Sequence, residues 1–131
     1  MVSNQEKEVE FFEIENDVLS TLEHANLEGS KAQGLDYTSA KRKTETLTSI
    51  LDRHSFNHSF DLLSIDAEEH DFEVLSSLDF SRYHPKLIVV EDESFEFAKQ
   101  DSNQFVLFMK EKGYVLTAHV LTNSYFLKKE R

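Results

Sequence analysis

Two short apolar runs organise the second half of the chain. Leu62 to Ile65 and Leu87 to Val90 are continuous hydrophobic stretches, and each one ends abruptly in carboxylate residues. Apolar runs of this length are typical of parallel strands that are covered on both faces. Two parallel strands need a crossover connection, which is usually helical and right-handed. The pattern therefore predicts a strand–helix–strand unit from Phe60 to Asp92.

The segment between the two runs has the spacing of an amphipathic helix over residues 70–79. Its apolar stripe consists of Phe72, Val74, Leu75 and Leu78. We expect this helix to pack across both strands. Because parallel strands end at the same edge of a sheet, the carboxylates that follow them should share one rim, where open α/β sheets place their ligand cleft. These carboxylates are Asp66, Glu68, Glu91 and Asp92.

The segment before this unit, residues 1–59, is predicted as a strand-and-loop region. Glu8 to Ile14 alternates polar and apolar residues, which favours a half-buried strand. Ser20 to Glu23 has the spacing of a capping box and indicates a short helix, and Glu28 to Tyr37 contains two glycines and indicates a loop. Thr44 to Arg53 is expected to be a strand end followed by a helical turn, with inward Leu47, Ile50 and Leu51.

The C-terminal part is expected to contain a helix and a hairpin. Ser94 to Lys112 is predicted to be helical, in one or two pieces, with Asn103 as an N-cap. Gly113 is expected to end the helix in the left-handed conformation. Tyr114 to Val120 and Tyr125 to Lys128 then follow as an antiparallel pair of strands.

Composition narrows the class of protein. The 131 residues suffice for one domain, and the 39% hydrophobic share with eleven phenylalanines suffices for a core. The absence of cysteine excludes disulfides and thiolate chemistry, and no run reaches membrane-spanning length. We expect a cytoplasmic protein. The net charge of −11 argues against nucleic acid and anionic membranes as direct partners.

One stretch of the sequence resembles a known signature. Residues 65–75 read Ile-Asp-Ala-Glu-Glu-His-Asp-Phe-Glu-Val-Leu. This resembles the Ile-Asp-x-Glu-Gly-x-Glu-x-x-Val-Leu signature of FkbM-type S-adenosylmethionine-dependent methyltransferases. The order of the flanking segments agrees, and nearly the whole chain can be laid along the C-terminal part of that family's domain. The sequence departs from the family's pattern at Glu69, which stands where the family has glycine, and at Ser64, where lysine is common.

The resemblance implies an α/β fold with a partial Rossmann-like methyltransferase sheet, whose parallel strands are followed by the C-terminal hairpin. Residues 60–131 would be the C-terminal half of the methyltransferase-like domain, preceded by segment 1–59 within a single domain. The implied reaction is methyl transfer from S-adenosylmethionine to a hydroxyl oxygen of a small molecule or sugar. The glycine-rich turn that binds this cofactor in the family has no counterpart in the sequence. The alternative is therefore a non-catalytic remnant that acts as an interaction or assembly module.

The signature acids Asp66 and Glu68, the histidine that follows them and the carboxylates that end the next strand together suggest site residues. Asp66, Glu68 and His70 are the catalytic candidates, as groups that orient an acceptor hydroxyl or remove its proton. Glu91 and Asp92 are the substrate-binding candidates. Each has a structural alternative, because carboxylates also stabilise the start of a helix and histidines are common on helix surfaces.

Two further hypotheses concern ligands and partners. The converging carboxylates, with His70 near them, could hold a hard divalent cation such as magnesium, although the resemblance does not require a metal. A partial sheet would also leave the strand Leu62–Ile65 open on one side unless segment Glu8–Ile14 covers it. We therefore expect either self-association through this edge or a partner that supplies the missing half-domain.

Overall fold

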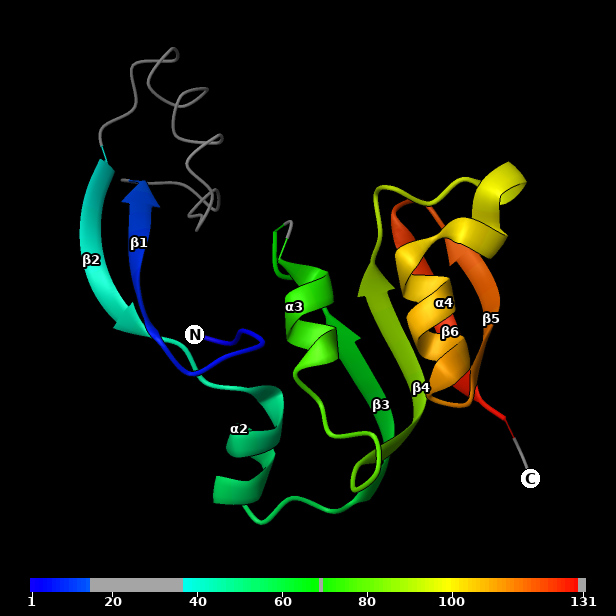
Figure 1. Cartoon of the computed structure of the whole chain (residues 1–131), viewed down its shortest axis with the longest axis horizontal. Helices are drawn as coiled ribbons and strands as arrows, with labels where there is room; N and C mark the ends of the chain where they lie inside the picture. Colours follow the sequence, from blue (N-terminus) through cyan, green and yellow to red (C-terminus); the bar gives the residue numbers. More distant parts are fainter. Residues whose placement is uncertain (15–36, 69, 130–131) are drawn as a thin grey trace.

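The computed structural model describes residues 1–14, 37–68 and 70–129 and has a mixed α/β architecture (Figure 1). Within these residues, β1 (Glu8–Ile14) and β2 (Tyr37–Lys43) form an antiparallel two-stranded sheet. A separate four-stranded sheet has the strand order β3-β4-β6-β5. No helix of the described residues is long and apolar enough to cross a membrane.

The four-stranded sheet contains the expected parallel pair and hairpin. β3 (Ser59–Ile65) runs parallel to β4 (His84–Glu91). β6 (Asn123–Lys128) lies between β4 and β5 (Tyr114–Val120) and is antiparallel to both. The strand–helix–strand prediction and the hairpin prediction are thus confirmed, and the sheet is mixed.

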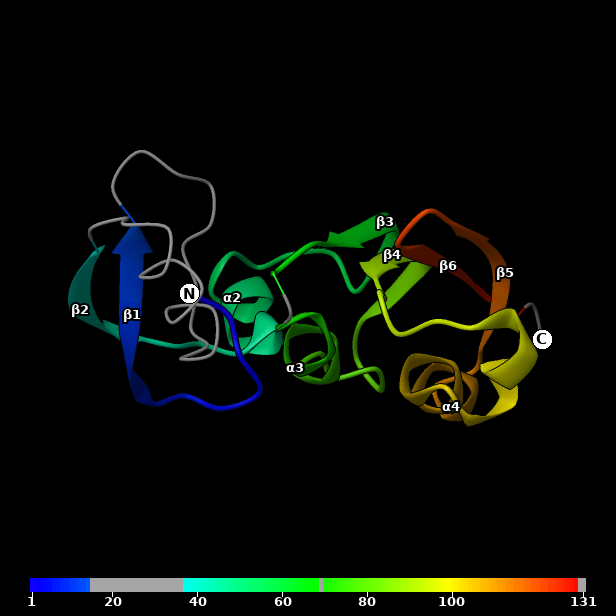
Figure 2. The same cartoon turned by 90° about the horizontal axis from the view of Figure 1, so that it is seen from above.

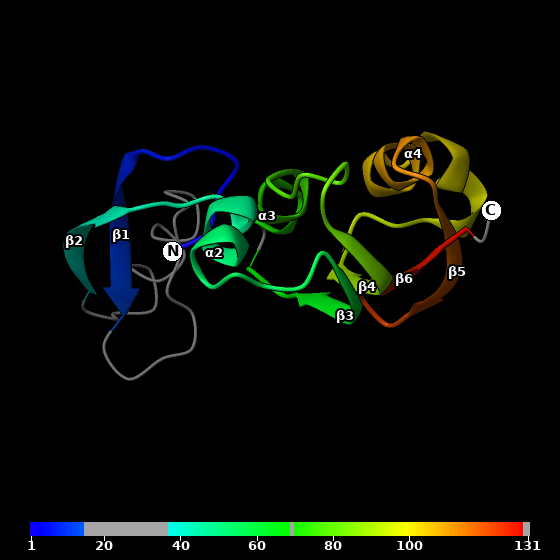
Figure 3. The same ribbon diagram turned by 90° about the horizontal axis from the view of Figure 1, so that it is seen from below.

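Two helices cover one face of this sheet. α3 (Asp71–Ser76) and α4 (Gln104–Glu111) lie side by side on the same side of the strands (Figures 2 and 3). The core between helices and sheet is contiguous, and its fully buried members include Leu75, Ile88, Val90, Met109 and Phe126. The packing of the helix after β3 across both parallel strands is therefore confirmed.

α3 is shorter than the 70–79 helix expected from the apolar stripe. Ser76 donates its hydroxyl to the carbonyl of Glu73 at 3.0 Å, and Ser77 donates to Val74 at 2.6 Å. Serine hydroxyls that bond to nearby carbonyls compete with the helical ladder, which explains the early end. Leu78 is still buried, so the stripe extends beyond the helix.

The opposite face of the sheet differs from the expectation of two-sided cover. Among the described residues, no helix lies on that face (Figure 3). Leu62 on β3 is 54% exposed there, although the parallel pairing with β4 is as predicted. The apolar runs thus predicted the strands correctly but not how much of them is covered.

The segment between β4 and β5 forms two helical pieces. A 3₁₀ helix, η1 (Phe97–Ser102), precedes α4, and the Asn103 side chain accepts a hydrogen bond from the amide of Val106 at 3.0 Å. Gly113 follows α4 with φ of +85°, a conformation that favours glycine. The predicted cap and stop are both confirmed. Tyr114 then donates its hydroxyl to the carbonyl of Pro85, and burial raises its pKa to about 12.

The N-terminal part joins the larger sheet through α2 (Leu47–Arg53), which Thr46 caps. Asp52 of this helix accepts hydrogen bonds from both Arg82 and Tyr83 just before β4. The expected inward residues of α2 are only half-buried; they are Leu47, Ile50 and Leu51. The predicted helix start at 20–23 and nearly all of the predicted loop 28–37 lie outside the described residues.

Candidate functional site: an acidic pocket at the strand ends

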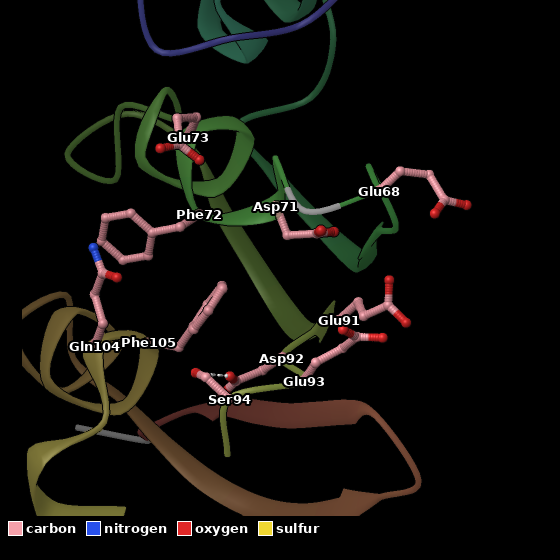
Figure 4. Close-up of a pocket in the computed structure, with 10 residues that line it drawn as sticks. All are labelled: Glu68, Asp71, Phe72, Glu73, Glu91, Asp92, Glu93, Ser94, Gln104 and Phe105. Atoms are coloured by element: carbon pink, nitrogen blue, oxygen red, sulfur yellow. Dashed lines mark hydrogen bonds between the residues drawn. The ribbon is translucent and has the colours of Figure 1, made fainter. Parts of the chain in front are cut away.

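A pocket of about 300 Å³ lies at the carboxyl ends of β3 and β4 (Figure 4). The start of α3, the segment after β4 and the start of α4 form its walls. Ten residues line it: Glu68, Asp71, Phe72, Glu73, Glu91, Asp92, Glu93, Ser94, Gln104 and Phe105. Six of these are carboxylates and none is basic, so the pocket favours cations and hydroxyl groups that donate hydrogen bonds.

The turn from β3 to α3 shapes one wall of the pocket. After Ile65 the chain leaves the sheet, and Glu68 adopts a positive φ of 49°. This conformation is uncommon for a residue with a side chain, and strained residues of this kind cluster at functional sites. Asp71 stabilises the turn, because its carboxylate accepts a hydrogen bond from the amide of Ala67 at 2.8 Å.

Three carboxylates meet at the centre of this rim. Asp66, Asp71 and Glu91 each offer one oxygen, and these oxygens lie within 4.8 Å of one another. Asp66 and Glu91 come from the ends of the two parallel strands, so the convergence expected from the sequence is real. The arrangement can share a proton, accept one from a ligand, or surround a cation.

Asp71 is the most unusual member of this group. Its side chain is only 4% exposed, and burial raises the pKa of its carboxyl group. The nearby charges of Glu91 and Asp66 raise the pKa further, whereas the hydrogen bond from Ala67 opposes the shift. A carboxylate with a raised pKa binds a proton more readily than an ordinary aspartate does, which suits a general base.

Asp92 has a different environment from the other rim carboxylates. It is 2% exposed, and its two oxygens accept hydrogen bonds from Ser94 at 2.7 Å and from Asn103 at 2.9 Å. Its amide donates to the carbonyl of Thr122 in the β5–β6 turn. Asp92 therefore connects the end of β4 to the start of α4 and to the hairpin.

His70 does not line the pocket. Its Nε2 atom lies 3.0 Å from the Ser3 hydroxyl, and its Nδ1 atom lies 3.7 Å from a carboxylate oxygen of Glu73. The structure thus gathers four of the five sequence-predicted site residues at this rim, and it places His70 against the N-terminal segment.

Several pocket residues had not been singled out from the sequence. Asp71 occupies the second glutamate position of the signature, which was a usable signal. Phe72 and Phe105 meet edge to face at 5.3 Å and form an apolar wall. Phe105 and Gln104 belong to α4, and no local pattern indicates that this helix reaches the strand ends.

Comparison with known families now bears on this geometry. A model of the methyltransferase FkbM domain matches residues 1–116, which include every residue of the pocket. The chain belongs to the FkbM methyltransferase family. No curated protein and no solved structure gives a significant match to it.

Membership of the FkbM family explains the position of the signature in the fold. Residues 65–75 comprise the end of β3, the turn with Glu68 and most of α3. The signature carboxylates Asp66 and Asp71 therefore belong to the group of three that meets at the rim. Glu69, at the signature's glycine position, lies outside the described residues.

Proposed function

We propose that this FkbM domain takes part in methyl transfer from S-adenosylmethionine to a hydroxyl oxygen of a small molecule or sugar. The observation that carries the proposal is Asp71, a buried signature carboxylate with a raised pKa that lines an open pocket. We interpret the β3–β4 pair, its helices and the hairpin as part of a Rossmann-like methyltransferase sheet. Family membership and the position of the pocket at the ends of parallel strands both support this interpretation.

The carboxylates have distinct roles in this proposal. In this reaction the methyl group would pass from sulfur to the acceptor oxygen, with S-adenosylhomocysteine as the leaving group. The acceptor hydroxyl has to lose its proton in the same process, and Asp71 receives that proton. Asp66 and Glu91 stabilise the protonated form of Asp71 through their nearby negative charge. Glu68, at the strained turn, accepts a hydrogen bond from the acceptor and holds it in place.

The walls of the pocket suit a polyhydroxylated acceptor. Carboxylates and the Gln104 amide can bind hydroxyl groups, and the rings of Phe72 and Phe105 provide an apolar surface for the carbon–hydrogen face of a sugar. The two carboxylate oxygens of Asp92 accept hydrogen bonds from Ser94 and Asn103, so Asp92 holds the start of α4 in place at the wall of the pocket. We assign the acceptor contacts to Glu68, Glu91 and Gln104.

The fit to the cofactor is partial. S-adenosylmethionine supplies an electrophilic methyl group on a positively charged sulfur, and a rim of carboxylates is favourable for that charge. A glycine-rich turn that brings backbone amides close to the cofactor is not found among the described residues, whose one glycine is Gly113 after α4. We propose that these residues handle the acceptor and its proton, and that most cofactor contacts come from a partner or from sequence beyond the described part.

The direct test is transfer of a labelled methyl group to a panel of sugars and small alcohols. The cofactor concentration has to be high enough to overcome weak binding. Asp71→Asn should lower the transfer rate by about 10²–10⁴-fold, the usual effect of losing a general base. Glu96→Gln, which changes an exposed carboxylate paired with Lys99 outside the pocket, should leave the rate unchanged.

Two results would contradict the proposal. Equal rates for Asp71→Asn and the unmodified chain would remove the assigned base. No methyl transfer to any acceptor, at cofactor concentrations that saturate the protein, would argue against an enzymatic role of the chain.

A further inference from the structure

The outer edge of β3 has no partner strand among the described residues. β3 is the first strand in the order β3-β4-β6-β5, and β1, which was considered as its cover, pairs with β2 instead. In a parallel pair, every second residue of the edge strand points its N–H and C=O groups away from the neighbour. Such a row of unpaired groups is a template for another strand.

The two edges of this sheet differ in how they are protected. The register between β5 and β6 shifts between Leu116 and Ala118, and irregularities of this kind hinder edge-to-edge pairing. β3 keeps a constant register with β4 along its length. Its one charged residue, Asp61, is neutralised by Lys86 at 2.6 Å. The β3 edge is therefore regular and carries no unpaired charge, within a chain whose net charge is −11.

The uncovered face adds an apolar contact at this edge. Leu62, Leu87, Leu127 and Val115 are neighbours across the four strands and form one row. Leu62 is the member of the row on the open edge, and 54% of it is exposed. Close by, Phe56 is exposed and packs edge to face on Phe60 at 5.1 Å.

The charge distribution along β3 favours one orientation of a second strand. Carboxylates gather at its end, at Asp66 and Glu68, whereas His58 and His84 lie at the start of the β3–β4 pair. Two copies of β3 in parallel would bring the carboxylate ends together, which like charges disfavour. An antiparallel arrangement places the carboxylate end of each copy beside the histidine end of the other.

We propose that a second copy of this chain docks here, β3 against β3 in antiparallel orientation about a two-fold axis at Leu62. In this register Leu62 lies opposite Leu62 of the second copy, Asp61 opposite Leu63, and Asp66 opposite His58. No like charges lie directly opposite each other, and the outward backbone groups of both edges are paired. The two sheets join into one continuous sheet. This inference is independent of the proposed methyl transfer.

Sedimentation of the 131-residue chain over a wide concentration range tests the dimer. We expect a reversible monomer–dimer equilibrium. Leu62→Lys, which adds the type of charge that protects natural edges, should weaken the dimer about tenfold or more. Val115→Lys is the matched control, because it adds the same charge to the same face, at the opposite edge, at a residue that is 44% exposed. It should leave the equilibrium unchanged.

Amide hydrogen exchange of the unmodified chain gives a second measurement that needs no variant. Protection in β3 should increase with protein concentration, whereas protection in β5 should not. A chain that stays monomeric at every concentration would overturn the proposal. Equal weakening by Leu62→Lys and Val115→Lys would also overturn it, because it would indicate packing of the two sheet faces instead of the edges.

Discussion

At the scale of single residues, the environment of Asp71 determines what the rim can do. Two buried aspartates differ in their partners: Asp92 has both oxygens bonded by neutral side-chain donors, whereas Asp71 has backbone donors and two nearby carboxylates. The hydrogen bonds of Asp92 hold the surrounding segments together, whereas the environment of Asp71 destabilises its negative charge. Functional sites commonly contain such perturbed groups because catalysis needs them, at a cost in folding stability.

This conflict between function and stability predicts the effect of Asp71→Asn on folding. The asparagine oxygen can still accept the hydrogen bond from Ala67, but the buried negative charge is gone. The variant should be more stable than the unmodified chain at neutral pH by about 0.5–2 kcal/mol. Chemical denaturation at several pH values measures this difference.

The sign of the pH dependence follows from the raised pKa of Asp71. The native state binds its proton more readily than the unfolded state, so the unmodified chain loses stability as pH rises through the native pKa. The advantage of Asp71→Asn should therefore be complete above that pKa and vanish below the ordinary aspartate value of 3.8. A variant that is less stable than the unmodified chain at neutral pH would contradict this assignment.

At the scale of elements, local sequence patterns predicted which helices and strands form, whereas long-range contacts determined which strands pair. The runs at β3 and β4, the Asn103 cap and the Gly113 stop were all recognisable because their signals lie within a few residues. The pairing of β1 with β2 was not predictable, because many pairings of an alternating strand satisfy the same pattern. The same holds for the candidate site. The position of the carboxylates at the rim was predicted from the two strand ends, but the burial of Asp71 and the contacts of His70 depend on segments that are distant in the sequence.

The junction of β4 and α4 provides a test at this scale. Asn103 caps the helix through the amide of Val106 and also donates to Asp92, which is buried. Asn103→Ala removes both contacts and should destabilise the fold by about 2–4 kcal/mol. Asn103→Ser keeps a capping oxygen but loses the donor to Asp92, so it should cost less, about 1–2 kcal/mol. Urea denaturation curves with equal slopes would measure both values, and equal losses would mean that the cap contributes nothing.

At the scale of the whole molecule, the described residues form the acidic pocket but leave part of the four-stranded sheet without cover. The described helices cover one face of the four-stranded sheet, and no described helix or strand covers the other face or the β3 edge. The matched FkbM model extends over residues 1–116, so the family assignment includes both the N-terminal region and the pocket. The chain thus has the carboxylates of the acidic rim in place, together with a sheet face and a sheet edge that could bind a partner.

This arrangement predicts the behaviour of the chain toward S-adenosylmethionine. The isolated 131-residue chain should bind the cofactor only weakly, because its described residues offer no glycine-rich turn whose amides could hold it. Calorimetric titration measures this directly. Binding with a dissociation constant of about 1 μM or lower, equivalent to about −8 kcal/mol, would show that the cofactor site has been assigned to the wrong residues.

The central claim is that Asp71 is a buried carboxylate with a raised pKa among its acidic neighbours. A carboxyl-detected NMR titration of the unmodified chain, repeated for Asp66→Asn, measures that pKa without requiring a substrate. We predict that Asp71 titrates at a higher pH than an ordinary aspartate, and that Asp66→Asn shifts its midpoint to lower pH because one neighbouring charge is lost. An Asp71 midpoint at or below 3.8, unchanged by Asp66→Asn, would contradict the account.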